Sequence, residues 1–135
     1  MPEAETNDKL EKLYKEAQED FKLTVINLSE KTRQVPTLKN KWIFRIVNEE
    51  KLLSKMKDTQ QDMISKLTSF SSKVKNGSIK VKAESMKQDE LIRLSGMISE
   101  QEEVVKFLRL LLDNQIKSFT WDIKNALEQA KLENI

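Results

Sequence analysis

The sequence predicts an all-α fold of long helices, and three observations carry this prediction. Only two Gly and two Pro occur among the 135 residues, so the chain has few sites for the tight turns that many short strands need. Apolar residues recur at steps of three and four over most of the length. Charged residues make up 34% of the chain and apolar residues only 38%, which leaves a modest core. The expected second helix would be about 43 Å long at 1.5 Å per residue, which favours an elongated subunit or part of an assembly.

The first expected helix begins at a cap formed by Asn7 or Asp8 and ends near Arg33. Because Pro36 disfavours helical geometry at the residue before it, residues 34–37 are expected to form a short connection. The apolar face of this helix has helical spacing and consists of Leu10, Leu13, Tyr14, Ala17, Phe21, Val25 and Leu28.

A second helix is expected from about Thr37, with a heptad seam in which steps of four and three alternate. Two members of this seam are polar and weaken it. The seam consists of Trp42, Ile46, Glu49, Leu53, Met56, Gln60, Met63, Leu67 and Phe70.

Residues 73–82 interrupt the helical period and alternate lysines with β-branched residues around Asn76-Gly77, a pattern typical of a small β-hairpin. In that hairpin one face carries Val74, Ile79 and Val81, and the other carries Lys73, Lys75, Lys80 and Lys82. Like charges facing each other are unfavourable in a free hairpin, so the arrangement indicates an anionic ligand. A solvated loop whose lysines maintain solubility is the equally weighted alternative.

Residues 84–132 contain no Pro and a single Gly, and one or two long helices are expected there, with Asp113-Asn114 as the predicted break. Between Val104 and Leu112 the apolar side chains cover nearly the whole circumference of a helix, which must then be buried on several sides. We expect homo-oligomerisation to bury them, and burial between helices of the same chain is the alternative. The residues assigned to assembly are Val105, Phe107, Leu108, Leu111, Leu112, Ile116, Phe119 and Ile123.

The charge is strongly segregated along the chain. Residues 1–30 carry a net charge of −4, residues 31–82 of +9 and residues 83–135 of −3. A basic segment of this kind favours a polyanionic partner, because lysines near phosphates release condensed counterions. We therefore predict a nucleic-acid-binding region over residues 1–82 and an oligomerisation region over residues 83–135.

The cations assigned to the polyanion site lie on the second helix and in the expected hairpin. Two aromatic residues lie among them: Trp42 is expected in the core because it begins the apolar seam, and Phe44 is the better candidate for stacking on bases. The assigned cations are Lys41, Arg45, Lys51, Lys55, Lys57, Lys73, Lys75, Lys80 and Lys82.

The residues for most catalytic chemistry are missing. The chain has no His and no Cys, and it lacks a phosphate-binding Gly-rich loop, so we assign no catalytic residue, no metal ligand and no cofactor. The acidic N-terminal segment has no hydrophobic run, which argues against a secretory signal or a membrane span and makes the cytoplasm the expected location.

Two stretches resemble the UvsY family of phage recombination mediators. The segment from Ile116 to Lys124 is similar to that family's pattern of Ile-Lys-Ser, an aromatic residue and then Ile-Lys. Arg45-Ile46 and the triplet Lys55-Met-Lys57 are similar to its Arg-Ile and basic-x-basic positions on the central helix. The similarity extends loosely over residues 38–132, whereas the Asn-Gly segment departs from the family's more Gly-rich loop.

This resemblance implies an open ring, a hexamer or heptamer, that binds single-stranded DNA with Lys55 and Lys57 as contacts. It further implies a mediator that helps a RecA-like recombinase of the UvsX type to displace a single-strand-binding protein, in DNA recombination, repair and replication. The location would be the cytoplasm of the infected bacterial host. Two other functions stay open: a helical coiled-coil adaptor whose lysines only solubilise it, and, ranked last, a peripheral membrane protein.

Overall fold

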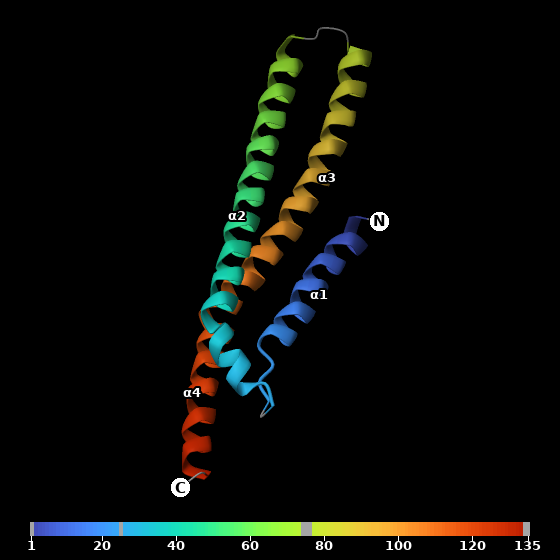
Figure 1. The fold of residues 1–135 in the computed structure, drawn as a ribbon. Helices are drawn as coiled ribbons and strands as arrows, with labels where there is room; N and C mark the ends of the chain where they lie inside the picture. The colour runs from blue at the N-terminus through green and yellow to red at the C-terminus, as the bar shows by residue number, and fades with distance from the viewer. Residues whose placement is uncertain (1, 25, 74–76, 134–135) are drawn as a thin grey trace. The chain divides into compact units, whose positions relative to one another are not determined.

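A computed structural model of the chain describes residues 2–24, 26–73 and 77–133. These described residues are helical over nearly their whole length and contain no strand, which confirms the all-α class. The elements, coloured along the chain in Figure 1, are α1 (Pro2–Asp20), α2 (Leu28–Lys73), α3 (Gly77–Leu110), the π-helical turn η1 (Leu111–Gln115) and α4 (Ile116–Glu133).

The helices form two compact units. Unit 1 comprises residues 1–48 and 104–135, and unit 2 comprises residues 49–103. Helices α2 and α3 therefore each contribute to both units. This packing division differs from the functional division at residues 82 and 83 predicted above, which concerns binding and assembly and stays a prediction.

The connection between the first two helices lies earlier than the sequence predicted. Helix α1 ends at Asp20 and α2 begins at Leu28, so the predicted break at residues 34–37 is wrong. A reciprocal pair of hydrogen bonds lies just before α2: the Thr24 N–H donates to Asn27 Oδ1 at 2.8 Å and the Asn27 N–H donates to Thr24 Oγ1 at 3.2 Å. This is the hydrogen-bond pattern of a capping box, with Asn in place of the usual Glu or Gln.

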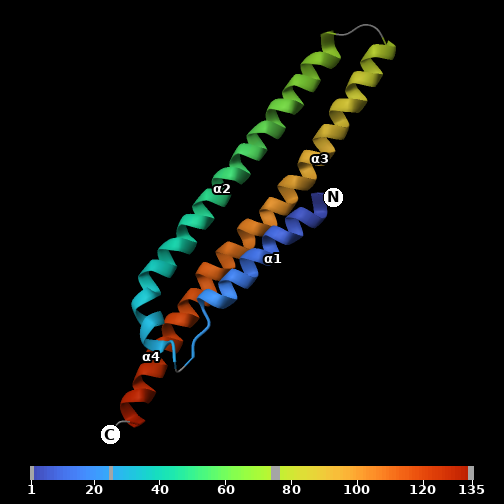
Figure 2. The same ribbon diagram turned by 45° about the vertical axis from the view of Figure 1, so that its right-hand side comes forward.

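Pro36 lies inside α2 instead of ending a helix. Proline has no N–H to donate to the carbonyl of Thr32, and its ring crowds the preceding turn. The ribbon of α2 bends in its N-terminal part in both Figure 1 and Figure 2, as expected of a helix with an internal proline. Helix α2 therefore continues past Pro36 in spite of the missing hydrogen bond.

The predicted β-hairpin is also wrong over the residues that the structure describes. Lys73 is the last residue of α2, and Gly77 to Lys82 form the start of α3; Val74, Lys75 and Asn76 lie outside the described residues. A type I′ hairpin turn requires positive φ at both central residues. Gly77 does not have a positive φ, and it is the first residue of α3.

Unit 1 contains the main core. Its largest fully buried side chains are Trp42, Val104 and Leu108, contributed by α2 and α3. Phe21, just after α1, connects this cluster to a second one, because its ring lies 6.2 Å from that of Trp42 and 5.2 Å from that of Phe119. Three helices and the start of α4 thus share one apolar interior, whose cluster members are Leu13, Ala17, Trp42, Ile46, Val104, Leu108, Leu111 and Ile116.

Unit 2 consists of the second part of α2 and the first part of α3, which run side by side in Figures 1 and 2. The predicted seam is present, since its members from Leu53 to Phe70 are half-buried while the positions between them are mostly exposed. Its two polar members have partners on α3. The Gln101 side chain donates to the carbonyl and the carboxylate of Glu49, and Gln60 Nε2 donates to Ser95 Oγ at 2.8 Å.

The predicted break at Asp113-Asn114 is a change of helix type. The chain stays helical from α3 into α4, but η1 makes one π-helical turn in which the Ile116 N–H donates to the carbonyl of Leu111, five residues earlier. Leu111 and Ile116 are both buried in the same cluster. The irregularity was correctly located, and its form was not.

Candidate nucleic-acid interface

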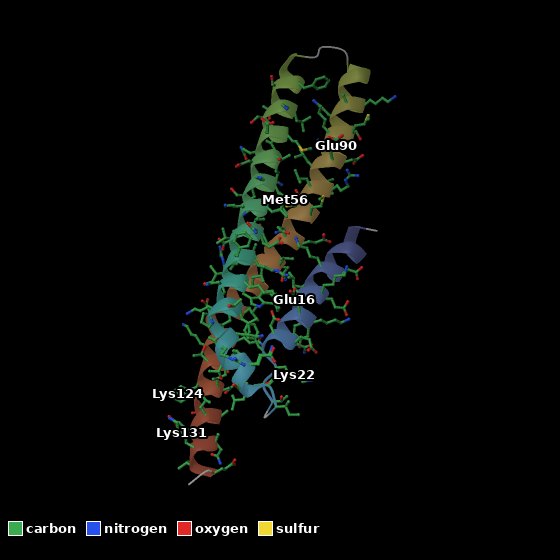
Figure 3. All side chains as sticks on the ribbon, viewed as in Figure 1. Glu16, Lys22, Met56, Glu90, Lys124 and Lys131 are labelled. Carbon is green, nitrogen blue, oxygen red and sulfur yellow. The ribbon has the colours of Figure 1, made fainter. Side chains whose placement is uncertain are left out.

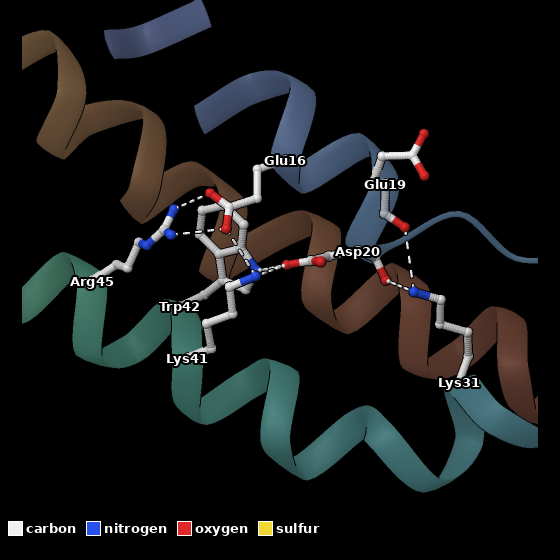
Figure 4. Close-up of polar contacts among 7 residues, drawn as sticks. All are labelled: Glu16, Glu19, Asp20, Lys31, Lys41, Trp42 and Arg45. Carbon is white, nitrogen blue, oxygen red and sulfur yellow. Dashed lines mark hydrogen bonds and ion pairs between the residues drawn. The ribbon is translucent and has the colours of Figure 1, made fainter. Parts of the chain in front are cut away.

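Two of the predicted DNA-binding cations are held by acidic side chains of α1. Arg45 makes a two-pronged ion pair with Glu16, in which Nη2 lies 2.8 Å from Oε1 and Nη1 contacts Oε2. Lys41 Nζ lies 2.9 Å from Glu16 Oε1 and 2.7 Å from Asp20 Oδ2. Figure 4 shows the four side chains converging between α1 and α2. Their opposite charges neutralise one another within the chain.

Trp42 lies beneath this ion-pair cluster. Its indole is fully buried, and its Nε1–H donates to Asp20 Oδ2 at 2.9 Å. The Lys41 ammonium and the Arg45 guanidinium lie 5.5 and 5.2 Å from the ring centroid, within cation–π range. The expectation that Trp42 belongs to the core is confirmed, and Asp20 links the core to the charged layer above it.

The electrostatics of the cluster follow from these contacts. Hydrogen bonds from Arg45 lower the pKa of Glu16 below its ordinary value of 4.5, and they outweigh the opposing effect of burial. Burial acts to lower the pKa of Lys41, but its hydrogen bonds with Asp20 and Glu16 outweigh burial and raise it. Both groups are therefore charged near neutral pH, and each charge is balanced by a partner.

The sequence contains a signal for this cluster that was missed in predicting the site. Glu16 and Asp20 are four residues apart, as are Lys41 and Arg45, so each pair occupies one face of its helix. Two such pairs of opposite sign on neighbouring helices are complementary. The net charge of residues 1–30 does not by itself show that Glu16 and Asp20 pair with Lys41 and Arg45.

The next cations of α2 have a different environment. Lys51 and Lys55 are exposed and lie one turn apart in unit 2, and their ammonium groups make no ion pair within the part of the chain that the structure describes. Lys57 is half-exposed and pairs with Glu102 of α3 at 3.6 Å. An exposed ion pair of this length is weak and easily exchanged for another anion.

Lysines also gather where α2 ends and α3 begins. Between residues 66 and 87 the sequence has six Lys and one acidic residue. Lys82 is exposed on α3, whereas Lys66 pairs with Asp62 at 3.2 Å and the Lys87 ammonium lies 4.8 Å from the ring centroid of Phe70. The side chains of Lys73, Lys75 and Lys80 lie outside the described residues.

Most residues assigned to assembly are buried inside unit 1. Leu108 is fully buried and Val105, Leu111, Ile116, Phe119 and Ile123 are nearly so. Phe107 and Leu112 are half-buried against the same core, and the Phe107 ring lies 6.3 Å from that of Tyr14. Helices α1 and α2 thus cover the apolar residues that were predicted to be buried by a second subunit. The intramolecular alternative accounts for this burial, and assembly stays a prediction.

The exposed aromatic residues of unit 1 are Tyr14, Phe44 and Trp121. Phe44, the predicted stacking candidate, is 68% exposed. Trp121 is 61% exposed on α4, with the Lys124 ammonium 5.5 Å from its ring centroid, and the sequence-based prediction gave it no role. Its place could have been read from the helical period, because it lies off the apolar stripe formed by Ile116 and Ile123.

Neither a metal centre nor a membrane span is found within the described ranges. Acidic side chains there form no group of three that would suit a metal ion. Among those residues no helix is apolar enough over a sufficient length to cross a bilayer.

Comparison of the chain with models of protein families, with curated proteins and with solved structures finds no match. The resemblance to UvsY therefore depends on the sequence motifs quoted above.

Proposed function

We propose that the protein binds single-stranded DNA and acts without catalysis as a recombination mediator, helping to load a RecA-like recombinase onto strands covered by single-strand-binding protein. The chemistry is counterion release at a basic surface, with no bond made or broken. The mediator role comes from the resemblance to UvsY. DNA binding has independent support from the charge distribution.

One observation carries the DNA-binding proposal: Lys51 and Lys55 are exposed, adjacent on α2 and unpaired within the described part of the chain. Lys41 and Arg45, which lie earlier on α2, are by contrast held by carboxylates of α1. Cations left without such partners are suited to phosphates. Lys57 can exchange its weak pair with Glu102 for a phosphate, and the exposed Lys82 of α3 adds to the basic surface of unit 2.

Assembly into a ring would strengthen this surface. A few lysines make a weak site, and repeating that site in a homo-oligomer raises the avidity for a long strand by about 100-fold or more. A hexamer or heptamer is the proposed state, and sedimentation velocity of the full chain at micromolar concentration tests it. A monomer in that measurement would remove the ring and leave a monomeric DNA-binding protein.

The DNA-binding surface is tested by titrating a fluorescein-labelled oligo(dT) over a series of salt concentrations and measuring anisotropy. The variant Lys51→Ala/Lys55→Ala should bind more weakly. Its log–log salt slope should be shallower by about 1.4, because each phosphate neutralised on a single strand contributes about 0.7 to the slope. The matched control is Lys12→Ala/Lys22→Ala, which removes the same charge from exposed positions in unit 1.

A control that loses as much affinity and slope as the test variant would show that net charge alone matters and would reject the surface. A wild-type protein that binds no oligonucleotide at about 50 mM salt, where electrostatic binding is still strong, would reject DNA binding altogether.

A helical adaptor is the second candidate function. It is favoured by the exposed apolar side chains of unit 2, among them Leu52, Ile64 and Ile92. An adaptor would use these residues to pack against a helix of another protein, and its lysines would only keep it soluble. Absence of DNA binding combined with a salt-independent protein complex would favour this function.

A further inference from the structure

Trp121 is the largest of the exposed side chains in unit 1. Large aromatic residues usually bury most of their surface, as Trp42 does here, yet Trp121 is 61% exposed. Among the described residues its ring has a cation–π neighbour in Lys124 of the next turn, at 5.5 Å, and no aromatic neighbour. The indole therefore contributes little to the core and presents much of its surface to solvent.

Lysines flank this indole on the same face of α4. Lys117, Lys124 and Lys131 lie four residues before, three after and ten after Trp121, so the 3.6-residue period places all four on one stripe. All three lysines are exposed. Figure 3 labels Lys124 and Lys131 on the same side of α4. Glu128 is the one acidic residue on this stripe, which leaves it with a net positive charge.

The opposite face of α4 is already occupied. Ile116, Phe119 and Ile123 are buried in the two apolar clusters of unit 1. A helix that lies in a membrane surface needs a wide apolar face beside its lysines. Here that face is used by the fold, and the exposed large apolar residues of α4 other than Trp121 are Leu127 and Leu132. The exposed stripe is thus cationic with an isolated aromatic ring, which fits a ligand that has both phosphates and flat aromatic groups.

We propose that this stripe of α4 is a second contact for single-stranded nucleic acid, in which a base stacks on Trp121 while Lys117, Lys124 and Lys131 face the phosphates. The inference rests on the proposed function, because it assumes that the protein binds single strands. It adds a site that the basic surface of unit 2 does not contain. Base stacking distinguishes this site from the basic surface of unit 2. Every base of a single strand can stack on the indole, whereas the bases of a duplex are already stacked on one another.

The test uses the full-length protein and the emission of its two tryptophans. Trp42 is buried, so an effect of oligo(dT) on Trp121 should appear as quenching that is lost in Trp121→Phe. In an anisotropy titration with the same oligonucleotide, Trp121→Leu should weaken binding by about 5-fold to about 100-fold, the range for loss of one stacked base. Trp121→Phe keeps an aromatic ring and should lose less.

The matched control is Leu132→Ala, which removes an exposed apolar side chain of α4 without removing an aromatic ring and should bind as wild type does. Circular dichroism verifies that each variant is folded, and a duplex of the same length should not quench Trp121.

The outcomes separate the two proposals. Normal DNA affinity of folded Trp121→Leu, together with wild-type emission that oligo(dT) leaves unchanged, would overturn the stacking site and leave the proposed function standing. Absence of any DNA binding by the wild type would overturn both. A response of Trp121 to anionic phosphatidylserine vesicles but not to oligo(dT) would overturn the inference in favour of a membrane contact.

Discussion

Helices α2 and α3 pass through both units, and they are packed very differently in each. In unit 1 they are covered by α1 and by the start of α4, and residues such as Trp42 and Leu108 are fully buried. In the described part of unit 2 the two helices pack against each other, and most of their seam residues are half-buried. The contrast shows that burial along one helix follows the number of its neighbours.

The sequence carries this difference in the width of its apolar face. Between Val104 and Leu112 apolar residues surround the helix, and there it has neighbours on several sides. Around Leu91, Leu94 and Ile98 the covered apolar residues form one stripe, which suits one neighbour, whereas Ile92 and Met97 are exposed. We therefore expect unit 1 to contribute most of the stability and unit 2 to contribute little.

The largest expected effect compares two identical substitutions on α3. Leu108→Ala creates a cavity in a fully buried site and should lower the free energy of unfolding by about 4 kcal/mol. Leu94→Ala truncates a half-buried residue of unit 2 and should cost about 1–2 kcal/mol. Urea unfolding followed by circular dichroism measures both.

Tryptophan emission recorded in the same titration reports on unit 1 alone, because both tryptophans lie there. Coincident emission and dichroism transitions would indicate that the units unfold together. Equal costs for the two substitutions would contradict the difference in packing.

A smaller effect is expected at the ion-pair cluster that closes unit 1. Asp20→Ala leaves the buried Trp42 N–H without its acceptor and should cost about 1–3 kcal/mol. Asp20→Asn keeps an oxygen acceptor for Trp42 but loses the charge that faces Lys41, so it should cost less. If both variants lost the same stability, the ion pair with Lys41 would be the important contact and the indole hydrogen bond would not.

The smallest effect is the pH dependence of unit 1. Arg45 holds the pKa of Glu16 below 4.5, so the stabilisation from this carboxylate is present above that pH and is lost as the pH falls through the lowered pKa. The stability advantage of the wild type over Glu16→Gln should therefore be largest above pH 4.5 and shrink toward acid. Thermal unfolding between about pH 3 and about pH 7 measures it. A constant difference across this range would mean that Glu16 does not titrate through its contact with Arg45.

The sequence predicted the regular features of the fold well. The seam from Trp42 to Phe70 is observed, because a long helix keeps its period and exposes the polar positions between seam residues. Trp42 was correctly placed in the core, and the irregularity in the last long helical stretch was located at Asp113-Asn114. These features depend on the spacing of residues along one helix, and that spacing can be read from the sequence.

The features that failed depend on competition between local signals. Pro36 indicated a break, but α2 begins at Leu28, after the two hydrogen bonds between Thr24 and Asn27, and it continues through the proline instead of ending. Asn76-Gly77 indicated a turn between strands, yet Gly77 opens a helix that continues to Leu110. A few residues of alternating pattern could not outweigh the helices on either side.

The candidate site was only partly predictable for a related reason. The basic character of α2 is evident from composition, but whether a lysine is neutralised depends on which helix packs beside it. Lys41 and Lys55 look alike in the sequence; Lys41 lies against two carboxylates of α1, whereas the ammonium of Lys55 makes no ion pair with a described residue. Their difference comes from tertiary contacts that no local pattern specifies.

The π-helical turn η1 also determines whether the helix can tolerate the deletion of a residue. A π turn contains about one residue more than an α-helical turn, and here it keeps Leu111 and Ile116 in one cluster although five residues separate them. Removing one exposed residue, such as Asn114, would leave a spacing of four, which an ordinary α-helix also places on one side. The π turn is thus a point where the helix can lose one residue while Leu111 and Ile116 stay on the same side of it.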